Sequence, residues 1–236
     1  MPRERILITV KTYPTLSEGY GELVCTAGVR EDGSWVRLYP VPFRLLDFDS
    51  RYRKFEWIET SLVRNTRDSR PESFRLVDPD DIAVMESVGT DDGWRERRRL
   101  LLGKCRVYDN LSLLIAEAHA NTCSLAVFKP ARILDFICEP AESRDWDAGR
   151  VAAMLARKNQ QDLFTDANWQ EDFQLVQKLP WKFSYRFEDA NGKQSTLQIL
   201  DWEAGALYWN CLKDADEITA LAKVRKKYLD EFLRTD

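Results

Sequence analysis

The sequence predicts a mixed α+β protein, with a small β-barrel and helical insertions in its N-terminal part and a β-hairpin with helices in its C-terminal part. Short apolar strands crowd the first part of the chain without the strand–helix–strand alternation of a doubly wound sheet. Two hairpin signals, Asp32-Gly33 and Asn191-Gly192, each lie between apolar segments. The end of the chain has helical periodicity instead.

The N-terminal strands follow from β-branched and aromatic runs that end at turn residues. They are predicted over residues 6–10, 22–30, 34–39, 55–63 and 74–77. Pro40 and Pro42 should end the third of these, since neither can donate to a ladder. Residues 64–73 form a polar loop. Residues 82–88 are a short strand or a helix, because periodicity does not separate the two.

Helices dominate the prediction beyond this point. They are expected over residues 94–102, 111–120, 145–159, 202–212 and 217–233, with strands over 124–128, 131–138, 181–187 and 196–200. Val151, Met154 and Leu155 should form the inner face of the third helix. Ile218, Leu221, Val224, Tyr228 and Phe232 should form one stripe on the last helix. The polar stretch 160–180 predicts a boundary between domains 1–159 and 160–236, which could also pack as one globule.

Composition limits the classes of function. The net charge of the 236 residues is -4, so a nucleic-acid partner would need a local basic patch. Five scattered cysteines and one histidine argue against a disulfide framework, a zinc site and metal sites built on several histidines. We expect a cytoplasmic protein without a membrane span or signal peptide.

Catalytic motifs are sparse in this sequence. It has no P-loop, no G-x-G-x-x-G and no G-x-S-x-G, which weakens nucleotide-hydrolysing, dinucleotide-binding and serine-hydrolase predictions. We expect no cofactor and no resident metal. Any catalysis would have to use carboxylates, Tyr, Lys or Arg.

The most distinctive feature is an aromatic–arginine row, Trp35, Arg37 and Tyr39, which shares one face of the hairpin because side chains alternate across a strand. With a two-residue turn at Asp32-Gly33, Gly28 would face Arg37 and leave space beside it. An open row of this kind stacks bases or holds a phosphate. A row covered by a helix, with Arg37 paired to an acid, would be structural, and both interpretations stay open.

Two further segments are rich in arginine. The loop 64–73 holds Arg67 and Arg70 beside acids, and residues 95–99 place several guanidinium groups on one helix face. Arginine forks match phosphate oxygens, although solvated ion pairs explain such runs equally well. The predicted nucleic-acid-binding residues are Trp35, Arg37, Tyr39, Arg44, Arg67, Arg70, Arg95, Arg98 and Arg99.

Four acids are candidates for catalysis: Asp68, Glu72, Asp201 and Glu203. Asp201 stands at a strand-to-helix junction, where it would cap the helix while Glu203 interacts with the helix dipole. The functional alternative is water activation or metal binding, as in nucleases or base-excising glycosylases.

Several stretches together resemble the dual OB-containing domain family, a prokaryotic conflict-system module. They are residues 11–14, 22–28, 35–44, 70–73, 182–187 and 201–203. The resemblance implies OB-like folding of the barrel and a role with nucleic acid, and it assigns no catalytic residues.

Our first hypothesis is a nucleic-acid-binding protein of bacterial antiviral defence, with DNA as the expected polymer and a partner protein from a defence operon left open. The second is a hydrolase acting on nucleic acid, a DNA glycosylase or a nuclease, and only a nuclease would require a divalent metal. The third is a non-catalytic sensor or scaffold subunit.

Overall fold

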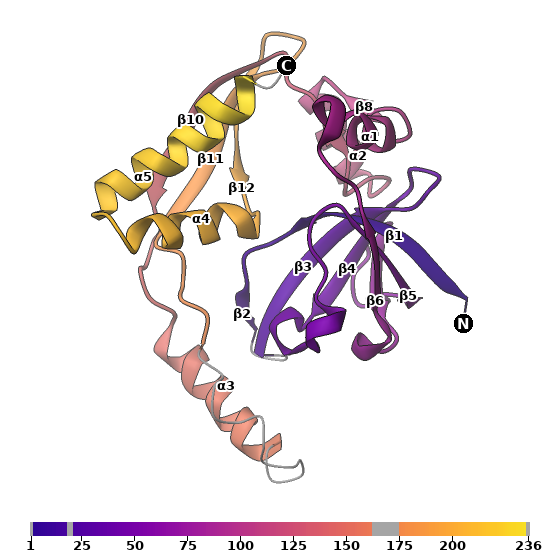
Figure 1. Ribbon diagram of the computed structural model, residues 1–236, viewed down its shortest axis with the longest axis vertical. Helices are drawn as coiled ribbons and strands as arrows, with labels where there is room; N and C mark the ends of the chain where they lie inside the picture. Colours follow the sequence, from indigo (N-terminus) through magenta and orange to yellow (C-terminus); the bar gives the residue numbers. More distant parts are fainter. Residues whose placement is uncertain (1, 18–20, 162–174, 235–236) are drawn as a thin grey trace.

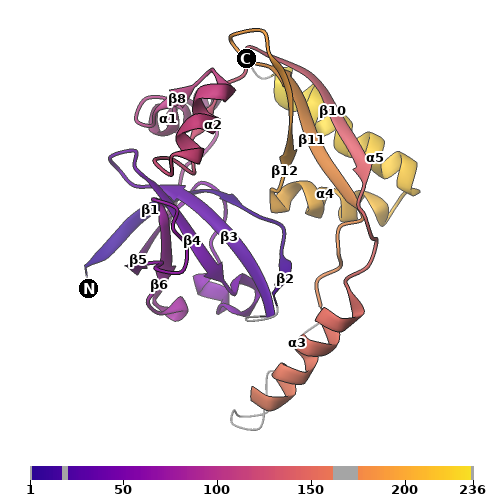
Figure 2. The same cartoon turned by 180° about the vertical axis from the view of Figure 1, so that it is seen from behind.

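The computed structural model describes residues 2–17, 21–161 and 175–234, and it confirms the mixed α+β prediction. A closed β-barrel forms the N-terminal part, and a three-stranded sheet with two helices forms the C-terminal part (Figure 1). Short helices and strands of the middle segment, residues 91–128, lie at one end of the barrel and beside one end of the C-terminal sheet (Figures 1 and 2).

Five strands close the barrel in the order β1-β3-β4-β6-β5, and β5 pairs again with β1. Their bounds are Arg3–Lys11 (β1), Gly21–Val29 (β3), Trp35–Val41 (β4), Glu56–Arg64 (β5) and Ser73–Leu76 (β6). Strands β4 and β6 run parallel, whereas the other barrel pairs are antiparallel. Two shorter strands, β2 (Thr15–Ser17) and β7 (Ala83–Ser87), add to β3 and β5, so the ambiguous segment 82–88 is a strand.

The β3–β4 hairpin turns through three residues, and the predicted two-residue turn is wrong. Arg30 N donates to Ser34 O at 2.9 Å, which closes a loop of Glu31, Asp32 and Gly33. Gly33 has a φ of 86°, the left-handed conformation that a three-residue hairpin loop needs at its last position.

The longer turn shifts the whole register by one residue. Trp35 pairs with Val29 and Arg37 with Ala27, so Gly28 does not lie opposite Arg37 and the predicted gap is absent. Gly28 serves a close approach instead, because a Cβ there would lie 2.5 Å from Leu7 O on β1.

Strand β4 also continues through Pro40, which was expected to end it. A register shift sets Tyr39 and Pro40 opposite Cys25 alone, between the pairs Val24–Val41 and Thr26–Leu38. A bulge tolerates a residue that cannot donate, because the ladder is already interrupted there.

Alternation along the strands divides the barrel residues into two packed sets. The inner set fills the barrel and includes Ile6, Ile8, Val36, Leu38 and Ile58. Each such side chain stabilises the fold by about 1.5–3 kcal/mol. The hydroxyls of Thr26 and Tyr52 satisfy each other inside this core at 2.8 Å.

The outer set packs beneath the middle segment. Leu7, Val29 and Trp57 on the barrel contact Val88 and Leu100, so this segment covers part of the outer face. The segment comprises α1 (Asp91–Leu101), β8 (Val107–Tyr108), α2 (Leu111–His119) and β9 (Val127–Phe128). The predicted strand 124–128 is therefore reduced to two residues.

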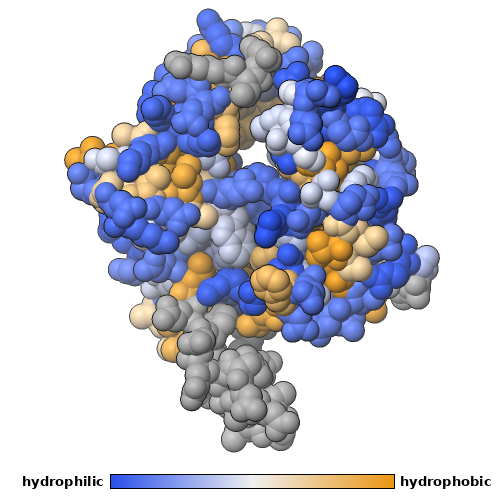
Figure 3. All heavy atoms as spheres, in the orientation of Figure 1, coloured by the Kyte–Doolittle hydropathy of each residue, from blue (hydrophilic) through white to orange (hydrophobic). Residues whose placement is uncertain are grey.

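The C-terminal sheet is β10 (Arg132–Pro140), β11 (Trp181–Glu188) and β12 (Gln194–Ile199). Figure 2 shows this sheet in front of α4 (Trp202–Leu212) and α5 (Glu217–Arg225), which cover its other face. Phe136, Phe183, Tyr208 and Val224 form the core between the two layers. Ile218, predicted on the buried stripe, is 82% exposed, in the first turn of α5. Figure 3 shows apolar groups over the α4–α5 corner.

Helix α3 (Ala148–Gln161) extends away from the barrel and the sheet (Figure 1). Met154 is buried, but Leu155 is 48% exposed, so its place on the predicted inner face is wrong: a projecting helix buries a narrower stripe. The boundary predicted between residues 159 and 160 falls inside α3, and β10 before it pairs with β11 after it.

Candidate functional site

The aromatic–arginine row shares the outer face of β4, as alternation predicts. Trp35 and Tyr39 are half-buried, and Arg37 is 9% exposed. Trp35 packs on the outer cluster beneath the middle segment. Most of the row is therefore covered, and the structural interpretation holds for Arg37.

Arg37 is neutralised by Asp68, which lies on the loop 65–72 between β5 and β6. The two side chains form an ion pair, and the guanidinium lies 4.7 Å from the centre of the Tyr39 ring. Ser73 Oγ and Arg70 Nε also donate to Asp68, at 2.7 and 2.8 Å. The hydrogen bonds from Arg70 and Ser73 hold the pKa of Asp68 far below its ordinary value.

This network folds the loop 65–72 onto β4. Arg37 N donates to Glu72 O at 2.7 Å, and Asn65 Nδ2 donates to Tyr39 O at 3.0 Å. Arg67 and Arg70 remain exposed on the outside of the loop. The predicted catalytic acids Asp68 and Glu72 hold the loop in place, since Glu72 accepts from Ser124 N at 3.0 Å.

A cleft of about 430 Å³ lies beside the hairpin, and we call it the Trp35 cleft. Its walls come from the hairpin tip, the end of loop 65–72 and the segment 106–126. They are Arg30, Gly33, Ser34, Trp35, Pro71, Glu72, Phe74, Arg106, Tyr108, Glu117, Thr122, Cys123, Leu125 and Ala126. The cleft thus joins predicted residues to Arg30 and Arg106, which are not among the predicted binding residues.

Arg30 and Arg106 both form ion pairs with acidic side chains. Arg30 Nε lies 2.6 Å from Glu4 Oε2, and Arg106 Nη2 lies 2.8 Å from Glu117 Oε1. Tyr108 Oη also donates to Glu117 at 2.5 Å. Arg106 is 62% exposed, so its ion pair can exchange for a phosphate at small cost.

The arginines of α1 point into solvent. Arg95, Arg98 and Arg99 are exposed, with Arg95 3.1 Å from Asp92 and Arg99 2.6 Å from Glu96. The helix is kinked at its start, where Trp94 has a φ of 64°. Lys104, just after α1, donates to Glu31 O at 2.5 Å and ties this segment to the hairpin tip.

Arg44 has a structural role. Its guanidinium lies 2.7 Å from the buried carboxylate of Glu22, which also accepts from Val176 N at 2.5 Å. Removing Arg44 would leave a buried carboxylate without its counter-charge, a costly state.

Asp201 and Glu203 lie elsewhere, where the N-terminal part meets α4. Asp201 caps the helix, accepting from Glu203 N at 2.9 Å, which confirms the structural interpretation. Both acids also hold Lys54, at 2.6 and 3.1 Å from its Nζ. Burial alone would lower the pKa of Lys54, but the two carboxylates raise it above its ordinary value. Thr12 at the end of β1 pairs with Asp201.

A second lysine, Lys11, lies at the same junction with α4, but its pKa is shifted in the opposite direction. Its Nζ lies 4.0 Å from the centre of the Phe43 ring and 5.5 Å from those of Tyr52 and Trp202. It donates to Tyr52 O at 2.8 Å, and within the described residues it forms no ion pair. Burial lowers its pKa to about 8. Its one sequence signal is a cation directly after the apolar, β-branched run 6–10.

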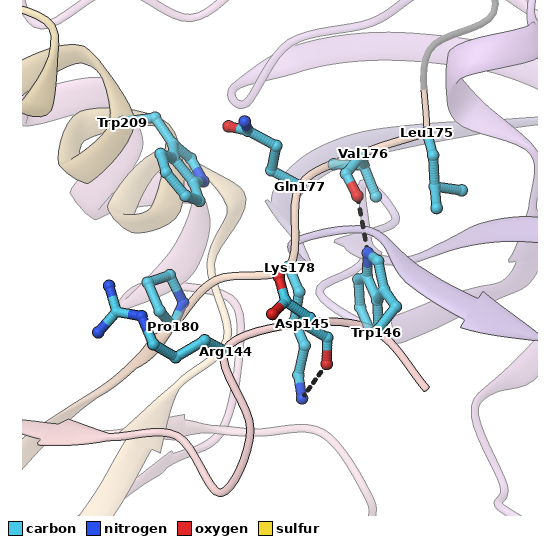
Figure 4. Close-up of a pocket in the computed structure, with 9 residues that line it drawn as sticks. All are labelled: Arg144, Asp145, Trp146, Leu175, Val176, Gln177, Lys178, Pro180 and Trp209. Carbon is cyan, nitrogen blue, oxygen red and sulfur yellow. Dashed lines mark hydrogen bonds between the residues drawn. The ribbon is translucent and has the colours of Figure 1, made fainter. Parts of the chain in front are cut away.

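Another cavity, of about 330 Å³, lies between the two chain segments that flank α3 and the helix α4 (Figure 4). Trp146 Nε1 donates across it to Val176 O at 2.7 Å, and Lys178 Nζ donates to Asp145 O at 3.2 Å. None of the predicted site residues lines it.

The predicted residues therefore fall into separate places. The row and the acids of loop 65–72 lie together, the α1 arginines form an exposed face, and Asp201 and Glu203 lie at the α4 junction with Lys54 and Lys11. Across the described residues, no three His, Cys, Asp or Glu side chains are grouped in a way that could hold a metal ion.

In residues 2–17, 21–161 and 175–234, no helix has both the length and the apolar character required to span a bilayer. The five cysteines are unpaired.

Two family models match this chain, and no curated protein or solved structure does. "Domain of unknown function (DUF8758)" matches residues 2–103, which hold the barrel and α1. "Domain of unknown function (DUF8757)" matches residues 108–236, more than half of the chain. The chain therefore belongs to the family of the domain of unknown function DUF8757.

Proposed function

We propose that this protein binds nucleic acid in the Trp35 cleft. The observation that carries the proposal is the position of the cleft: a half-buried indole opens into it, beside two arginines, at the edge of the barrel face formed by β3 and β4. Indole rings stack on bases of any sequence, and exposed guanidinium groups hold the phosphates between them.

The topology of the barrel supports this site. Counting only the barrel strands, the ring runs first, second, third, fifth, fourth and back to the first, with the third and fifth parallel. We take this as an OB-like barrel. Such barrels bind oligonucleotides on the face of their second and third strands, with the loop between their fourth and fifth strands beside it. Here that face is β3–β4 and that loop is 65–72.

Local charge supports it as well. The chain is acidic overall, yet Arg95, Arg98, Arg99 and Arg106 are all exposed in the segment that borders the cleft and the hairpin tip. Such a face attracts a polyanion locally and makes binding sensitive to salt.

The resemblance to the dual OB-containing domain family extends the proposal to prokaryotic antiviral defence, in the cytoplasm, with DNA as the expected polymer. It rests on the stretches quoted above, of which 22–28, 35–44 and 70–73 contribute to the barrel and its loop.

The test is fluorescence anisotropy with labelled oligodeoxythymidine, a duplex and an RNA of equal length. We expect Trp35→Ala to weaken binding roughly tenfold through lost stacking. Arg95→Ala/Arg98→Ala/Arg99→Ala should reduce the salt slope by about 2. The matched control is Lys223→Ala/Lys226→Ala, which removes one exposed charge from α5 and one from the residue directly after it, and should change neither quantity.

Binding that is insensitive to salt and to Trp35→Ala would reject the proposal. Absence of binding to all three polymers would favour the sensor or scaffold hypothesis, which predicts a stable complex with a partner protein instead.

A further inference from the structure

The junction of β1 and α4 holds two lysines that differ in their surroundings. Lys54 lies between the carboxylates of Asp201 and Glu203, whereas Lys11 lies among the rings of Phe43, Tyr52 and Trp202. Lys11 also lines a cavity of about 520 Å³, so its amine can be reached from outside. An ion pair already accounts for Lys54, but none of the described contacts neutralises Lys11.

We propose that Lys11 is a nucleophilic amine that forms an imine with the aldehyde group of a phosphate-bearing substrate bound in this cavity. No role for this lysine follows from the Trp35 cleft. The proposal stands on the aromatic walls, the accessible amine and the cations at the cavity mouth.

Burial leaves the Lys11 amine partly uncharged near neutral pH. Burial lowers its pKa to about 8, Glu203, Glu56 and Asp201 oppose that shift, and Lys54 adds to it. At about pH 7 roughly a tenth of the amines would carry a free electron pair, against fewer than about one in a thousand for an ordinary lysine. Only the uncharged amine attacks a carbonyl.

Hydrogen bonding orients that electron pair. Lys11 Nζ donates to Tyr52 O at 2.8 Å. The Phe43 ring, whose centre lies 4.0 Å from Nζ, covers another side of the amine. Lys11, Phe43 and Tyr52 all line the cavity, together with Glu56. Since Lys11 forms no ion pair within the described residues, a substrate aldehyde has no salt bridge of this amine to displace.

The cavity is lined by two arginines that can hold a phosphate and by two carboxylates, Asp49 and Glu56. Arg51 and Arg53 are exposed there, and neither forms an ion pair within the described residues. The Arg51 guanidinium donates to the carbonyls of Leu46 and Arg44, at 2.8 and 3.1 Å, which position it but leave its charge. Phe48, 83% exposed, adds an aromatic ring on the rim.

The step is balanced without a further reactant. The Nζ electron pair attacks the aldehyde carbon, a C–N bond forms, and a proton moves from nitrogen to oxygen to give a carbinolamine. With one proton from solvent the hydroxyl leaves as water, and a protonated imine remains on Lys11. Neither an oxidant nor a reductant is needed.

Two sources share this chemistry: the aldehyde of an abasic deoxyribose within DNA, and a free phosphorylated aldehyde. The first rests on the proposed nucleic-acid binding, and the second does not. The experiment therefore uses two probes, an oligonucleotide with one abasic site and pyridoxal 5′-phosphate.

Full-length protein is incubated with each probe and sodium cyanoborohydride near pH 7, and the reduced adduct is located by peptide mass mapping. We expect an adduct at Lys11, formed at least about tenfold faster than at exposed Lys129. Lys11→Met should abolish that adduct, whereas the matched Lys129→Met should not. Circular dichroism checks that each variant is folded.

The rate of trapping at Lys11 should rise with pH around a midpoint of about 8, in contrast to Lys129. Lys54→Met should slow trapping near pH 7, because Asp201 and Glu203 then act on Lys11 without their own cation.

An adduct with either probe supports the proposal and identifies the source. Absence of a Lys11 adduct with both probes, or equal rates at Lys11 and Lys129, overturns it. Binding of an intact oligonucleotide, measured with Lys11→Met, separates this failure from failure of the proposed function, because the Trp35 cleft is unchanged in that variant.

Discussion

Arg37 on β4 and Lys11 at the end of β1 are both cations of the barrel strands that lie largely out of water. Arg37 is paired with Asp68, and this ion pair holds the loop 65–72 on the barrel. Lys11 has aromatic rings and a backbone carbonyl around it. A buried charge with a counter-charge organises structure, whereas one without a counter-charge changes its protonation instead.

The same contrast separates the two proposed sites. At the Trp35 cleft the acids Glu72 and Glu117 are used in hydrogen bonds and ion pairs, so this cleft is suited to recognition. Near Lys11, Asp201 and Glu203 are paired with Lys54, and Glu56, which lines the Lys11 cavity, accepts from Arg53 N at 2.6 Å. The second region is therefore suited to chemistry.

The largest effect is expected where the paired cation is removed. Arg37→Met should lower the free energy of unfolding by about 3 kcal/mol, because the half-buried Asp68 loses its buried arginine partner and keeps only the exposed Arg70. Urea denaturation followed by tryptophan fluorescence measures it. Arg37→Met/Asp68→Asn is the matched control and should recover most of the loss. A cost below about 1 kcal/mol for Arg37→Met would show that the pair does not hold the loop.

Removing Lys11, the cation without an ion pair, should stabilise the protein. Lys11→Met should raise the free energy of unfolding by about 1 kcal/mol near pH 7, after allowance for partial exposure. The folded chain loses the Lys11 proton around pH 8 and the unfolded chain near 10.4, so the wild type binds fewer protons when folded and gains stability across this window.

The advantage of Lys11→Met should therefore shrink from about pH 8 to about pH 10.4, as seen in thermal melts across that range. Lys129→Met, on the surface, should follow the wild type throughout. A constant advantage at all pH values would mean that packing, and not charge, causes it.

The smallest expected effect is on the loss of stability at low pH, through Asp68. Since the pKa of Asp68 is lowered in the folded state, its contribution is complete above the ordinary aspartate pKa and is lost as pH falls below it. Asp68→Asn should flatten the acid limb of the stability curve, measured by urea midpoints from about pH 5 to about pH 2. An unchanged acid limb would place the titration on other carboxylates.

Strand periodicity by itself determined which residues share a face. Trp35, Arg37 and Tyr39 lie together on β4 even though the predicted register is wrong, because alternation does not depend on the partner strand. The mixed α+β class, the closed barrel and most element positions could be predicted in the same way, since they follow from local patterns.

The turn at Gly33 shows a feature that local patterns do not predict: the register of the hairpin. Glycine suits both a two-residue and a three-residue hairpin loop, and the extra residue moved every cross-strand pair. The exposure of the row likewise depended on Asp68 and on the outer cluster, both of which come from other parts of the chain.

The Lys11 cavity was decided by the tertiary structure alone. Thr12 pairs with Asp201, and this contact brings the end of β1 against the start of α4, across most of the sequence. The protonation of a lysine amine depends on what surrounds it, and here the rings, the carboxylates and Lys54 come from three separate segments. The sequence by itself determined that Lys11 follows an apolar strand. Only the tertiary structure buried its amine, because the groups around it come from distant parts of the chain.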